Sequence, residues 1–313
     1  MAWRLLGRIH SLDPSNDRLS SHMQGPVAAV FGDRIRIYFA ARNSAGKSYP
    51  AYIDVSEENP LRVLNVHDAP VMDFGPAGTF DDEGIMPACI VPTPGEIRLY
   101  YSGWNRRVTI PYHNTTGVAI SVDGGMSFRR KFEGPVLDRT PHDPFMAVTP
   151  WVVRTGDQWR MWYVAGRGWL RKGGALEPIY GIKYATSVDG IAWNRLSDFV
   201  IPFRHEEEAI ARPTVLFADG AYHMWYCFRD SDDFRDGPGS YRIGYAYSRD
   251  GVTWKRADHL SGLARSPDGW DSTMQCYPYV VETKIGFLLF YSGNGFGRTG
   301  VGCAIWEGGF PTL

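Results

Sequence analysis

The run IRLYYSGW, residues 97–104, decides the fold, because versions of it recur along the whole chain. The other versions are IRIYFAAR (35–42), WRMWYVAG (159–166), YHMWYCFR (222–229) and FLLFYSGN (287–294). Their common aromatic recurs every 62 to 65 residues, at Phe39, Tyr101, Tyr163, Tyr226 and Tyr291. A fixed period of this kind is the sequence signature of a repeat architecture.

Two further markers share the period. A polar cluster, a short apolar run and a proline precede each aromatic run: FDDEGIMP (80–87), HDPFMAVTP (142–150), EEEAIARP (206–213), DSTMQCYP (271–278) and a weaker SSHMQGP (20–26). After the aromatic run, three units carry an alternating strand that ends in Ser-x-Asp-Gly, at Ser121, Ser187 and Ser248. Asp-Gly between alternating runs is a strong hairpin signal, so each unit is predicted to hold four strands.

Four-stranded units repeated around an axis describe a β-propeller. We therefore predict an all-β fold, a five-bladed β-propeller with four-stranded blades, in which residues 1–313 form a single domain. The last unit ends after its third strand, Val301 to Trp306, whereas Ala2-Trp3-Arg4 resembles a fourth strand. The N-terminal strand is expected to join the last blade and close the ring, which would remove an exposed edge.

Composition narrows the functional class. The net charge is −1 at pH 7 and no basic stretch is present, so we expect no nucleic-acid partner. No segment approaches the roughly 20 apolar residues of a membrane span, and we expect no membrane partner and a cytoplasmic location. The four cysteines show no CxxC pair and are expected to be buried free thiols; they are Cys89, Cys227, Cys276 and Cys303.

The two ends of the blades differ. The first turn of each unit is tight, whereas the loops expected at residues 104–116, 166–178 and 228–240 are long and polar. Long loops on a rigid scaffold are where function usually lies. Because the inner strands converge on the axis, the residues that enter them are expected to surround one central pocket.

Those entering residues are rich in carboxylates. Glycosidic bond cleavage needs one carboxylic acid to protonate the leaving oxygen and a second carboxylate to activate water or attack the sugar. A third nearby anion can raise the pKa of the acid. The alternative is that most of these carboxylates are solvated loop charges. The acids of the second, third and fourth units are Asp81, Asp82, Glu83, Asp143 and residues 206–208.

This pattern resembles the five-bladed glycoside hydrolase superfamily, which includes families 43, 32, 68 and 130. The resemblance covers almost the whole chain and implies a catalytic Asp, Asp, Glu set on three successive blades. Asp82, Asp143 and either Glu207 or Glu208 follow that order, and His142-Asp143-Pro144 is similar to the Arg-Asp-Pro of invertases. One departure is that the first unit offers His22 and Gln24 and no acid, so the set is shifted by one blade.

Other residues around the funnel are candidates for substrate binding. Trp104 is expected to stack on a sugar ring, with rim packing as the alternative. Arginine guanidinium groups suit carboxylates and phosphates. Arg212 stands out because it directly precedes the inner-strand proline; its alternative role is an ion pair with a nearby acid. The full candidate set is His22, Arg42, Asp81, Glu83, Trp104, His142, Arg167, Arg212, Arg229, Asp271 and Asn294.

The sequence thus predicts a carbohydrate-active enzyme, a glycosidase, glycoside phosphorylase or transferase, whose partner is an oligosaccharide or glycoside. The alternatives are a non-catalytic glycan-binding or scaffold propeller and a sugar-modifying enzyme of a polysaccharide pathway. The histidines show no metal-binding spacing, so no metal site or required cofactor is expected. A structural cation in the central channel, as in some relatives, is compatible with the resemblance.

Overall fold

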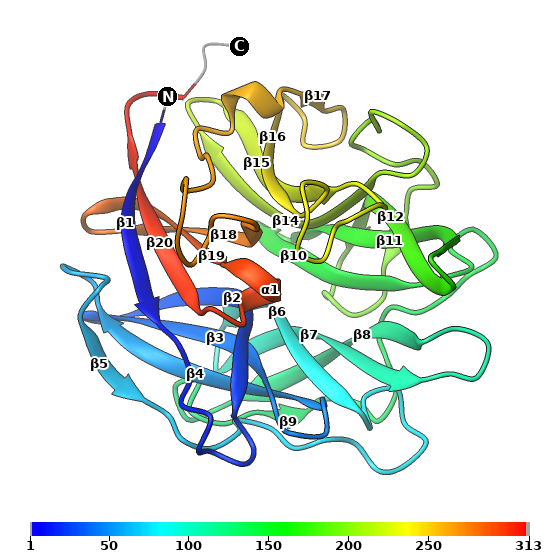
Figure 1. Cartoon of the computed structure of the whole chain (residues 1–313), viewed down its shortest axis with the longest axis horizontal. Coiled ribbons are helices and arrows are strands. Elements are labelled where there is room, and N and C mark those ends of the chain that lie inside the picture. Colours follow the sequence, from blue (N-terminus) through cyan, green and yellow to red (C-terminus); the bar gives the residue numbers. More distant parts are fainter. Residues whose placement is uncertain (1, 311–313) are drawn as a thin grey trace.

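Residues 2–310 are described by the computed structural model, and they form five groups of strands around a common centre (Figure 1). Group 1 holds β2 (Ser21–Phe31), β3 (Arg34–Arg42), β4 (Ser48–Ser56) and β5 (Val63–Val66). Group 2 holds β6 (Gly84–Thr93), β7 (Glu96–Arg106), β8 (Tyr112–Ser121) and β9 (Arg129–Arg130). Group 3 holds β10 (Ala147–Thr155), β11 (Gln158–Lys172), β12 (Ala175–Ser187) and β13 (Asn194–Arg195).

Group 4 holds β14 (Ala209–Ala218), β15 (Ala221–Arg229), β16 (Arg242–Ser248) and β17 (Lys255–Arg256). Group 5 combines β18 (Cys276–Thr283), β19 (Gly286–Ser292) and β20 (Val301–Glu307) with the first strand of the chain, β1 (Ala2–His10). Helical structure is limited to the turn Asp258–Leu260 and the short α1 (Asn294–Gly297). The predicted all-β class is confirmed.

Neighbouring strands in each group are antiparallel, and β1 pairs with β20 from Ala2–Glu307 to His10–Val301. Groups 1 and 2 join into one eight-stranded sheet through a single parallel pair, Ser48 with Gly84. The first strands β2, β6, β10, β14 and β18 each contact the next, and β18 contacts β2. The entrances to all five groups therefore lie around one centre.

The predicted Ser-x-Asp-Gly hairpins are confirmed. In the turn at Ser121, the Asp123 carboxylate accepts the backbone N–H groups of Met126 and Ser127, at 3.0 and 3.1 Å. These bonds and those from the serine hydroxyls outweigh burial and lower the pKa of Asp123 to about 2. The turns at Ser187 and Ser248 repeat this arrangement through Asp189 and Asp250.

The hairpins also join one group to the next. In groups 1, 2 and 3, the aromatic residue before the common aromatic of the second strand donates to a carbonyl of the turn in the following group. Tyr38 reaches Gly125 O at 2.7 Å, Tyr100 reaches Gly190 O at 2.8 Å, and Trp162 Nε1 reaches Gly251 O at 2.8 Å. Successive groups are thus held at a fixed separation by buried hydrogen bonds.

Two of the three predicted loops are mostly paired strand. Residues 104–116 were expected to form a long loop, but β7 and β8 pair as far as Arg106 and Tyr112. Residues 166–178 were expected to form a long loop, but β11 and β12 continue as a paired hairpin to Lys172 and Ala175. The turn is made by Gly173 and Gly174, whose φ angles of 54° and 85° are favourable for glycine. Residues such as Trp169 and Leu176 therefore lie on paired strands and not in a loop.

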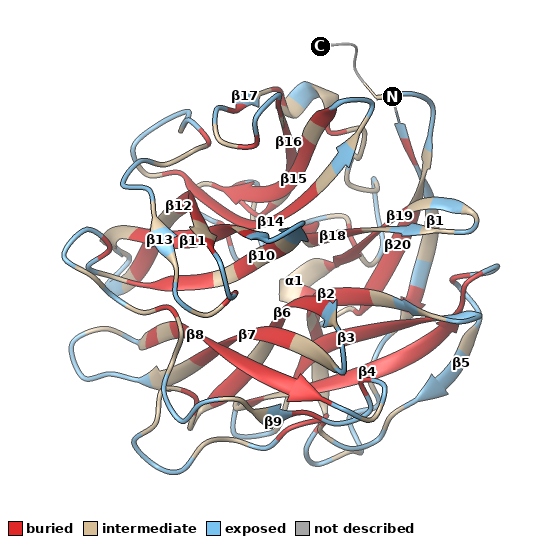
Figure 2. Ribbon diagram, turned by 180° about the vertical axis from the view of Figure 1, so that it is seen from behind, coloured by how far each residue is buried: buried red, intermediate tan, exposed pale blue. Residues whose placement is uncertain are grey.

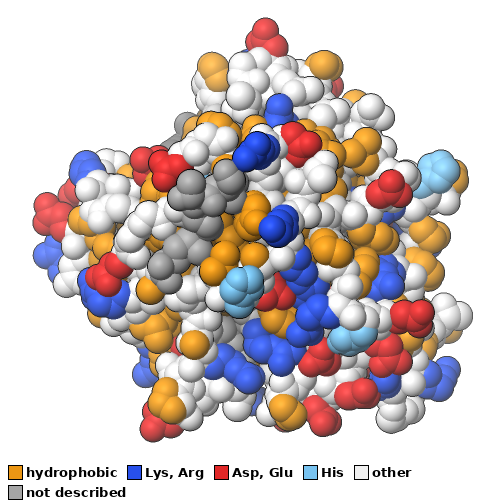
Figure 3. Space-filling model, turned by 90° about the horizontal axis from the view of Figure 1, so that it is seen from above, with side chains coloured by type: hydrophobic (Ala, Val, Ile, Leu, Met, Phe, Trp, Pro, Cys, Tyr) orange, Lys and Arg blue, Asp and Glu red, His pale blue; other side chains and the backbone are white. Residues whose placement is uncertain are grey.

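Buried side chains fill the spaces between the groups, and exposed residues lie on turns and outer edges (Figure 2). All four cysteines are free and buried, as predicted. On the face in Figure 3, lysine and arginine side chains are interspersed with acidic ones. Within residues 2–310, no helix has the length and apolar character needed to cross a membrane, and the cytoplasmic location stays a prediction.

The N-terminal strand gives a first testable prediction. Trp3 is 5% exposed and packs edge-on against Trp225 and Trp306, with ring centroids 5.3 and 4.9 Å away. Trp3→Ala should lower the free energy of unfolding by about 3–5 kcal/mol, because it leaves a cavity between β1 and group 4. The measurement is chemical denaturation, with Leu5→Ala on the same strand as the control, since Leu5 is 38% exposed. Equal losses in both variants would contradict this packing.

Candidate functional site

A cavity of about 390 Å³ lies where the five groups meet, and residues of every group line it. Pockets for small ligands usually have volumes of roughly 300–1,000 Å³. The lining is dominated by arginine and aromatic side chains. Its charged residues are Arg42, Glu177, Arg212, Arg229 and Arg235, and its largest aromatic residues are Trp104, Tyr112, Tyr180, Phe234, Tyr241, Tyr277 and Phe296.

The residue before each inner-strand proline lines this cavity. The five are Gly25, Met86, Thr149, Arg212 and Tyr277. Gly25, Thr149, Arg212 and Tyr277 have left-handed φ angles of 66°, 43°, 56° and 59°, and each lies at a break in the register with the second strand. Such backbone is strained for a residue other than glycine and clusters at functional sites. The bulges place the side chain of the residue before proline at the cavity.

Further lining residues come from the ends of second strands and the starts of third strands. Arg42 pairs with Ser48, and Trp104 pairs with Asn114. Trp104 Nε1 also donates to Ser48 Oγ at 2.7 Å, which ties the rims of groups 1 and 2 together. The indole is therefore held in place at the cavity wall, where its ring is available for stacking.

Arg212 is a buried cation of the cavity lining. Its side chain is 3% exposed and donates to three backbone carbonyls, Pro87 O at 2.8 Å, Gly25 O at 3.1 Å and Pro26 O at 3.0 Å. These bonds connect group 4 to groups 1 and 2. The expected alternative, an ion pair with a nearby acid, is wrong for the described chain, in which Arg212 has no acidic partner within salt-bridge distance. Burial lowers its pKa.

Arg42 and Arg229 also lack an acidic partner among residues 2–310. Arg42 donates to Gln24 Oε1 at 2.8 Å, and Gln24 in turn donates to the Tyr277 hydroxyl at 3.3 Å. Arg229 is 1% exposed, donates to Pro178 O at 2.7 Å and lies over the Phe234 ring at 3.8 Å. Three cationic groups of the cavity thus have neutral hydrogen-bond partners or aromatic faces, and no carboxylate partner among the described residues.

The pKa of His22 is affected by burial and by the positive charges near this site. Burial and the charges of Arg42 and Arg298 lower the pKa of His22 to about 3. The imidazole is therefore neutral at physiological pH and is hydrogen-bonded to Ser21 at 3.0 Å. His22 lies beside the arginines but is not part of the cavity lining.

Glu177 is the one carboxylate among the described lining residues. Both of its oxygens accept from Arg235 Nη2, at 2.7 and 2.9 Å. Glu177 lies on β12 and is 8% exposed, whereas the Arg235 side chain comes from the loop between β15 and β16 and is 61% exposed. An acid at the wall of an otherwise cationic cavity can hold or release a proton toward a bound ligand.

The predicted catalytic acid Asp143 and the predicted substrate-binding acid Asp81 lie elsewhere. Asp143 is 2% exposed and accepts from the Tyr163 hydroxyl at 2.9 Å, Lys183 at 2.6 Å and Arg195 at 3.2 Å. Asp81 is bound in the same way by Tyr101 at 3.0 Å and Arg130 at 2.8 Å. Neither lines the cavity, which corrects their expected position in the funnel.

This arrangement is a structural repeat. In groups 2, 3 and 5 a buried aspartate accepts from the common tyrosine located 20 residues later, and the third case is Asp271 with Tyr291 at 2.8 Å. We call this pairing the aspartate–tyrosine latch. Group 1 has Phe39 instead of tyrosine and Leu19 instead of aspartate, and both are buried in one core cluster. The missing acid of the first unit is thus matched by a missing hydroxyl.

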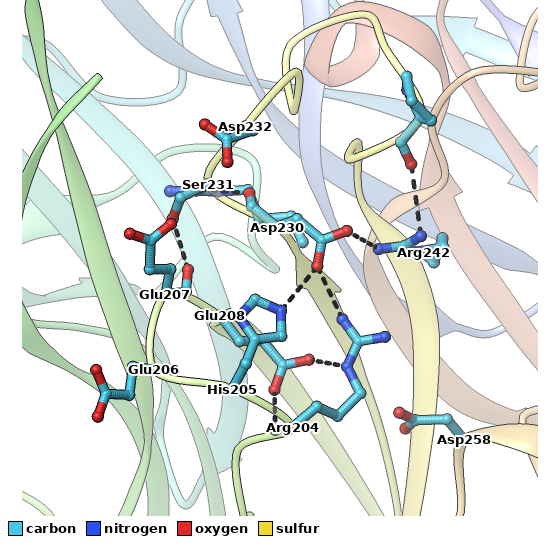
Figure 4. Close-up of polar contacts among 12 residues, drawn as sticks. Arg204, His205, Glu206, Glu207, Glu208, Asp230, Ser231, Asp232, Arg242 and Asp258 are labelled. Atoms are coloured by element: carbon cyan, nitrogen blue, oxygen red, sulfur yellow. Dashed lines mark hydrogen bonds and ion pairs between the residues drawn. The ribbon is translucent and has the colours of Figure 1, made fainter.

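Group 4 replaces the latch with a larger network, and Figure 4 shows its part around Arg204, His205, Glu208 and Asp230. Tyr226 donates to Asp258 at 2.5 Å, and Arg256 bridges Asp258 to Glu208, with 2.7 Å to each carboxylate. Arg204 binds Glu208 and Asp230, and His205 also contacts Asp230, at 3.0 Å. Glu207 points to Lys172 at 2.6 Å and is 45% exposed. Glu207 and Glu208 are therefore structural and rim groups, contrary to the sequence prediction.

The remaining predicted residues also lie outside the cavity lining. Asp82 accepts from Gly78 N at 2.7 Å, and Glu83 lies 3.4 Å from Lys47. Arg167 donates to Glu206 O at 2.9 Å, and Asn294 Oδ1 accepts two backbone N–H groups at 2.9 Å. His142 is exposed. Of the predicted set, the structure brings Arg42, Trp104, Arg212 and Arg229 together at the cavity.

Sequence reasoning missed Glu177, Arg235, Asn114 and four tyrosines of the lining, Tyr112, Tyr180, Tyr241 and Tyr277. The position before the inner-strand proline was a signal for Tyr277, as it was for Arg212. No comparable motif marks Glu177 or Arg235, because both lie in segments without a repeat counterpart. Within the described part of the chain, no cluster of three or more His, Cys, Asp or Glu side chains is placed to hold a metal ion.

Comparison with known proteins supports the fold. No protein-family model matches the chain. Two sequences from Mycobacterium tuberculosis strains, uncharacterized protein MT1551 and uncharacterized protein Rv1502, are each 38% identical over 309 residues, covering 98% of this chain and 100% of the relative. The chain belongs to the family of these mycobacterial proteins.

Among solved structures, a glycosyl hydrolase from Bacteroides ovatus superposes with a TM-score of 0.75 at 15% identity, covering 99% of this chain and 96% of the other. A structure from the GH130 family of mannoside phosphorylases, described as containing hydrolases that target β-1,2 mannosidic linkages in Candida mannan, has a TM-score of 0.72 at 15% identity and covers 99% and 95%. The fold is therefore that of the propeller-type glycoside hydrolases.

The buried carboxylates predict how stability depends on pH. Burial would raise the pKa of Asp143, but hydrogen bonds from Lys183 and Tyr163 outweigh it and lower the pKa; Arg256 has this effect on Glu208. A lowered folded-state pKa stabilises the protein above the unfolded-state values of 3.8 and 4.5, and that stability is lost as the pH falls below them.

Asp143→Asn should therefore lower the free energy of unfolding by about 3–5 kcal/mol at pH 7, because Lys183 stays buried without its partner. Between pH 6 and pH 3, the free energy of unfolding of the variant should fall less than that of the wild type. Urea unfolding at pH 7, pH 6 and pH 3 measures both effects. Asp157→Asn is the control, since Asp157 is exposed in the turn between β10 and β11. A wild-type pH profile in the Asp143 variant would refute a structural role for this carboxylate.

Proposed function

We propose that this protein binds a carbohydrate in the central cavity and cleaves or transfers a glycosyl unit, with Glu177 as its acid–base residue. The observation that carries the proposal is the cavity at the meeting point of the five groups, in a glycoside hydrolase fold, with a single lining carboxylate. Trp104 and the lining tyrosines supply flat apolar faces with polar edges, which suit the faces and hydroxyls of a sugar ring.

The proposal differs from the paired-carboxylate mechanism expected from the sequence. Hydrolysis by two carboxylates needs both groups beside the scissile bond, about 5–10 Å apart. In the described chain, Asp143 and Glu208 are buried in ion pairs with Lys183 and Arg256 and do not line the cavity. One acid at the cavity instead favours transfer of a glycosyl unit to an acceptor that brings its own nucleophilic oxygen, such as phosphate or a sugar hydroxyl.

A second candidate function is non-catalytic glycan binding. It is favoured by the two hydrogen bonds that hold Glu177 to Arg235, since a carboxylate bound through both oxygens is not a ready proton donor. The third alternative, a sugar-modifying enzyme of a polysaccharide pathway, would use the same cavity with an activated sugar as ligand. The three functions differ in what the bound sugar becomes.

The proposal includes the architecture predicted from the sequence. The five groups are interpreted as five blades of one propeller domain, with β1 as the outer strand of the last blade. The ring of contacts among the first strands and the β1–β20 pairing support this interpretation. No cofactor is part of the proposal. A structural cation in the channel would lie beside Arg212 and Arg42, so the proposal leaves it out.

Glu177→Gln tests the catalytic role. The variant should lower kcat about 10²- to 10⁴-fold while the affinity for the glycoside changes little, because the amide keeps the shape of the acid but cannot transfer its proton. The assay is turnover of a panel of glycosides and oligosaccharides, each with and without inorganic phosphate. Glu206→Gln is the matched control, since Glu206 is exposed outside the cavity.

Full turnover by the Glu177 variant would show that Glu177 is not the acid–base residue. Saccharide binding by the wild type without turnover on any panel member would favour the glycan-binding alternative. A nucleotide-sugar panel separates the third alternative, because only a sugar-modifying enzyme of that type would consume the activated sugar.

A further inference from the structure

The cavity has an excess of positive charge that the described chain does not neutralise. Four arginines and one glutamate line it, and that glutamate is paired with Arg235. Arg42, Arg212 and Arg229 therefore stay without a carboxylate partner in residues 2–310. A buried charge that is not paired is costly to a folded protein. This imbalance indicates a ligand that carries negative charge.

Two of the arginines reach the cavity from different groups. Arg42 ends β3 of group 1, and Arg235 comes from the loop that follows β15 of group 4. Both side chains line the same cavity. Burial lowers the pKa of Arg42 against a smaller, raising effect of Tyr277, and the charge of Arg235 acts in the same direction as burial. Within residues 2–310 the Arg42 side chain donates one hydrogen bond, to Gln24, so its guanidinium keeps donors for a ligand. Like charges brought together in this way favour an anion between them.

Arg212 has a different part in this arrangement. Its terminal nitrogens are committed to the carbonyls of Pro87, Gly25 and Pro26, so it contributes charge more than hydrogen bonds. The side chain is buried, and its charge is poorly screened by solvent. Arg212 therefore deepens the positive potential at the base of the cavity without competing for the same ligand oxygens.

Neutral polar groups of the lining show that the ligand is more than a free anion. Asn114 Oδ1 and Thr149 Oγ1 are buried without a hydrogen-bond partner among the described residues. An amide oxygen accepts hydrogen bonds and needs a donor, which a carboxylate or phosphate oxygen cannot supply. A sugar hydroxyl can supply it. Trp104 and Tyr180 in the same lining add ring faces for the body of the sugar.

We propose that the ligand is an acidic sugar, a saccharide bearing a carboxylate or phosphate, whose anionic group is held by Arg42 and Arg235 above Arg212. The inference rests on the proposed carbohydrate function and names its substrate class. The anionic group competes with Glu177 for Arg235. Binding of an acidic sugar therefore releases the carboxylate that the proposed function uses as an acid–base residue.

The test compares matched ligands by isothermal titration calorimetry with the full chain. The pairs are glucuronate with glucose, galacturonate with galactose, and mannose 6-phosphate with mannose, and inorganic phosphate is titrated alone. At least one acidic sugar should bind about 10- to 100-fold more tightly than its neutral partner, the range of a charge-assisted hydrogen bond. The preference should weaken between 50 and 500 mM salt, roughly as screening increases.

Arg42→Gln and Arg235→Gln should each remove most of this preference. Arg235 is exposed, so its variant is expected to fold even if the Arg42 variant is less stable; thermal unfolding of both checks this. Arg129→Gln is the charge-matched control, because Arg129 is exposed on β9 outside the cavity. Loss of preference in the first two variants and retention in the third supports the proposal.

Three results would overturn it. Equal affinity for the acidic and neutral members of every pair would remove the acidic substrate and leave the carbohydrate function standing. Inorganic phosphate binding as tightly as the sugar phosphate, with the neutral sugar bound alongside it, would assign the arginines to a free ion. No binding by any sugar would reject the substrate class together with the carbohydrate function.

Discussion

The arrangement of the first four groups depends on hydrogen bonds from the second strands of groups 1, 2 and 3 to the turn of the next group. Tyr38, Tyr100 and Trp162 donate from the core of one group to a glycine carbonyl of the next, at 2.7 to 2.8 Å. Because these bonds are buried, breaking one leaves an unsatisfied polar group, and the separation between groups is strongly specified. The first strands are then brought around one centre, and the bulge before each proline turns Thr149, Arg212 and Tyr277 to the cavity.

The buried acids belong to this scaffold. Asp81, Asp143 and Asp271 each accept from the tyrosine 20 residues later, and the first two also bind an arginine of the fourth strand. A carboxylate held by a hydroxyl and a cation is an anchor for the loop that enters the next strand. The cavity at the centre is lined instead by residues that differ from one group to the next, above all Arg42, Glu177 and Arg212.

This division explains which predictions from the sequence were correct. The strand order, the Asp-Gly turns and the buried cysteines follow from short-range patterns, and the structure confirms them. The acids were predicted to be catalytic because regular spacing was interpreted as catalytic repetition, whereas the structure places Asp143 and Glu208 in buried ion pairs outside the cavity lining. The spacing indicates a structural pair, because the acid and the common tyrosine are separated by the same interval in groups 2, 3 and 5 and group 1 lacks both. Arg212 was noticed because it departs from its equivalents in the other units.

The sequence by itself determined the repeat, the four-strand unit and the residues that face inward before each proline, because these depend on local periodicity and turn chemistry. Only the tertiary structure decided which charges meet. Glu177 and Arg235 are 58 residues apart, and Arg42 and Arg235 come from different groups; their encounter depends on how the groups pack. The net charge of a cavity depends on residues that are distant in the chain, so no local sequence pattern predicts it.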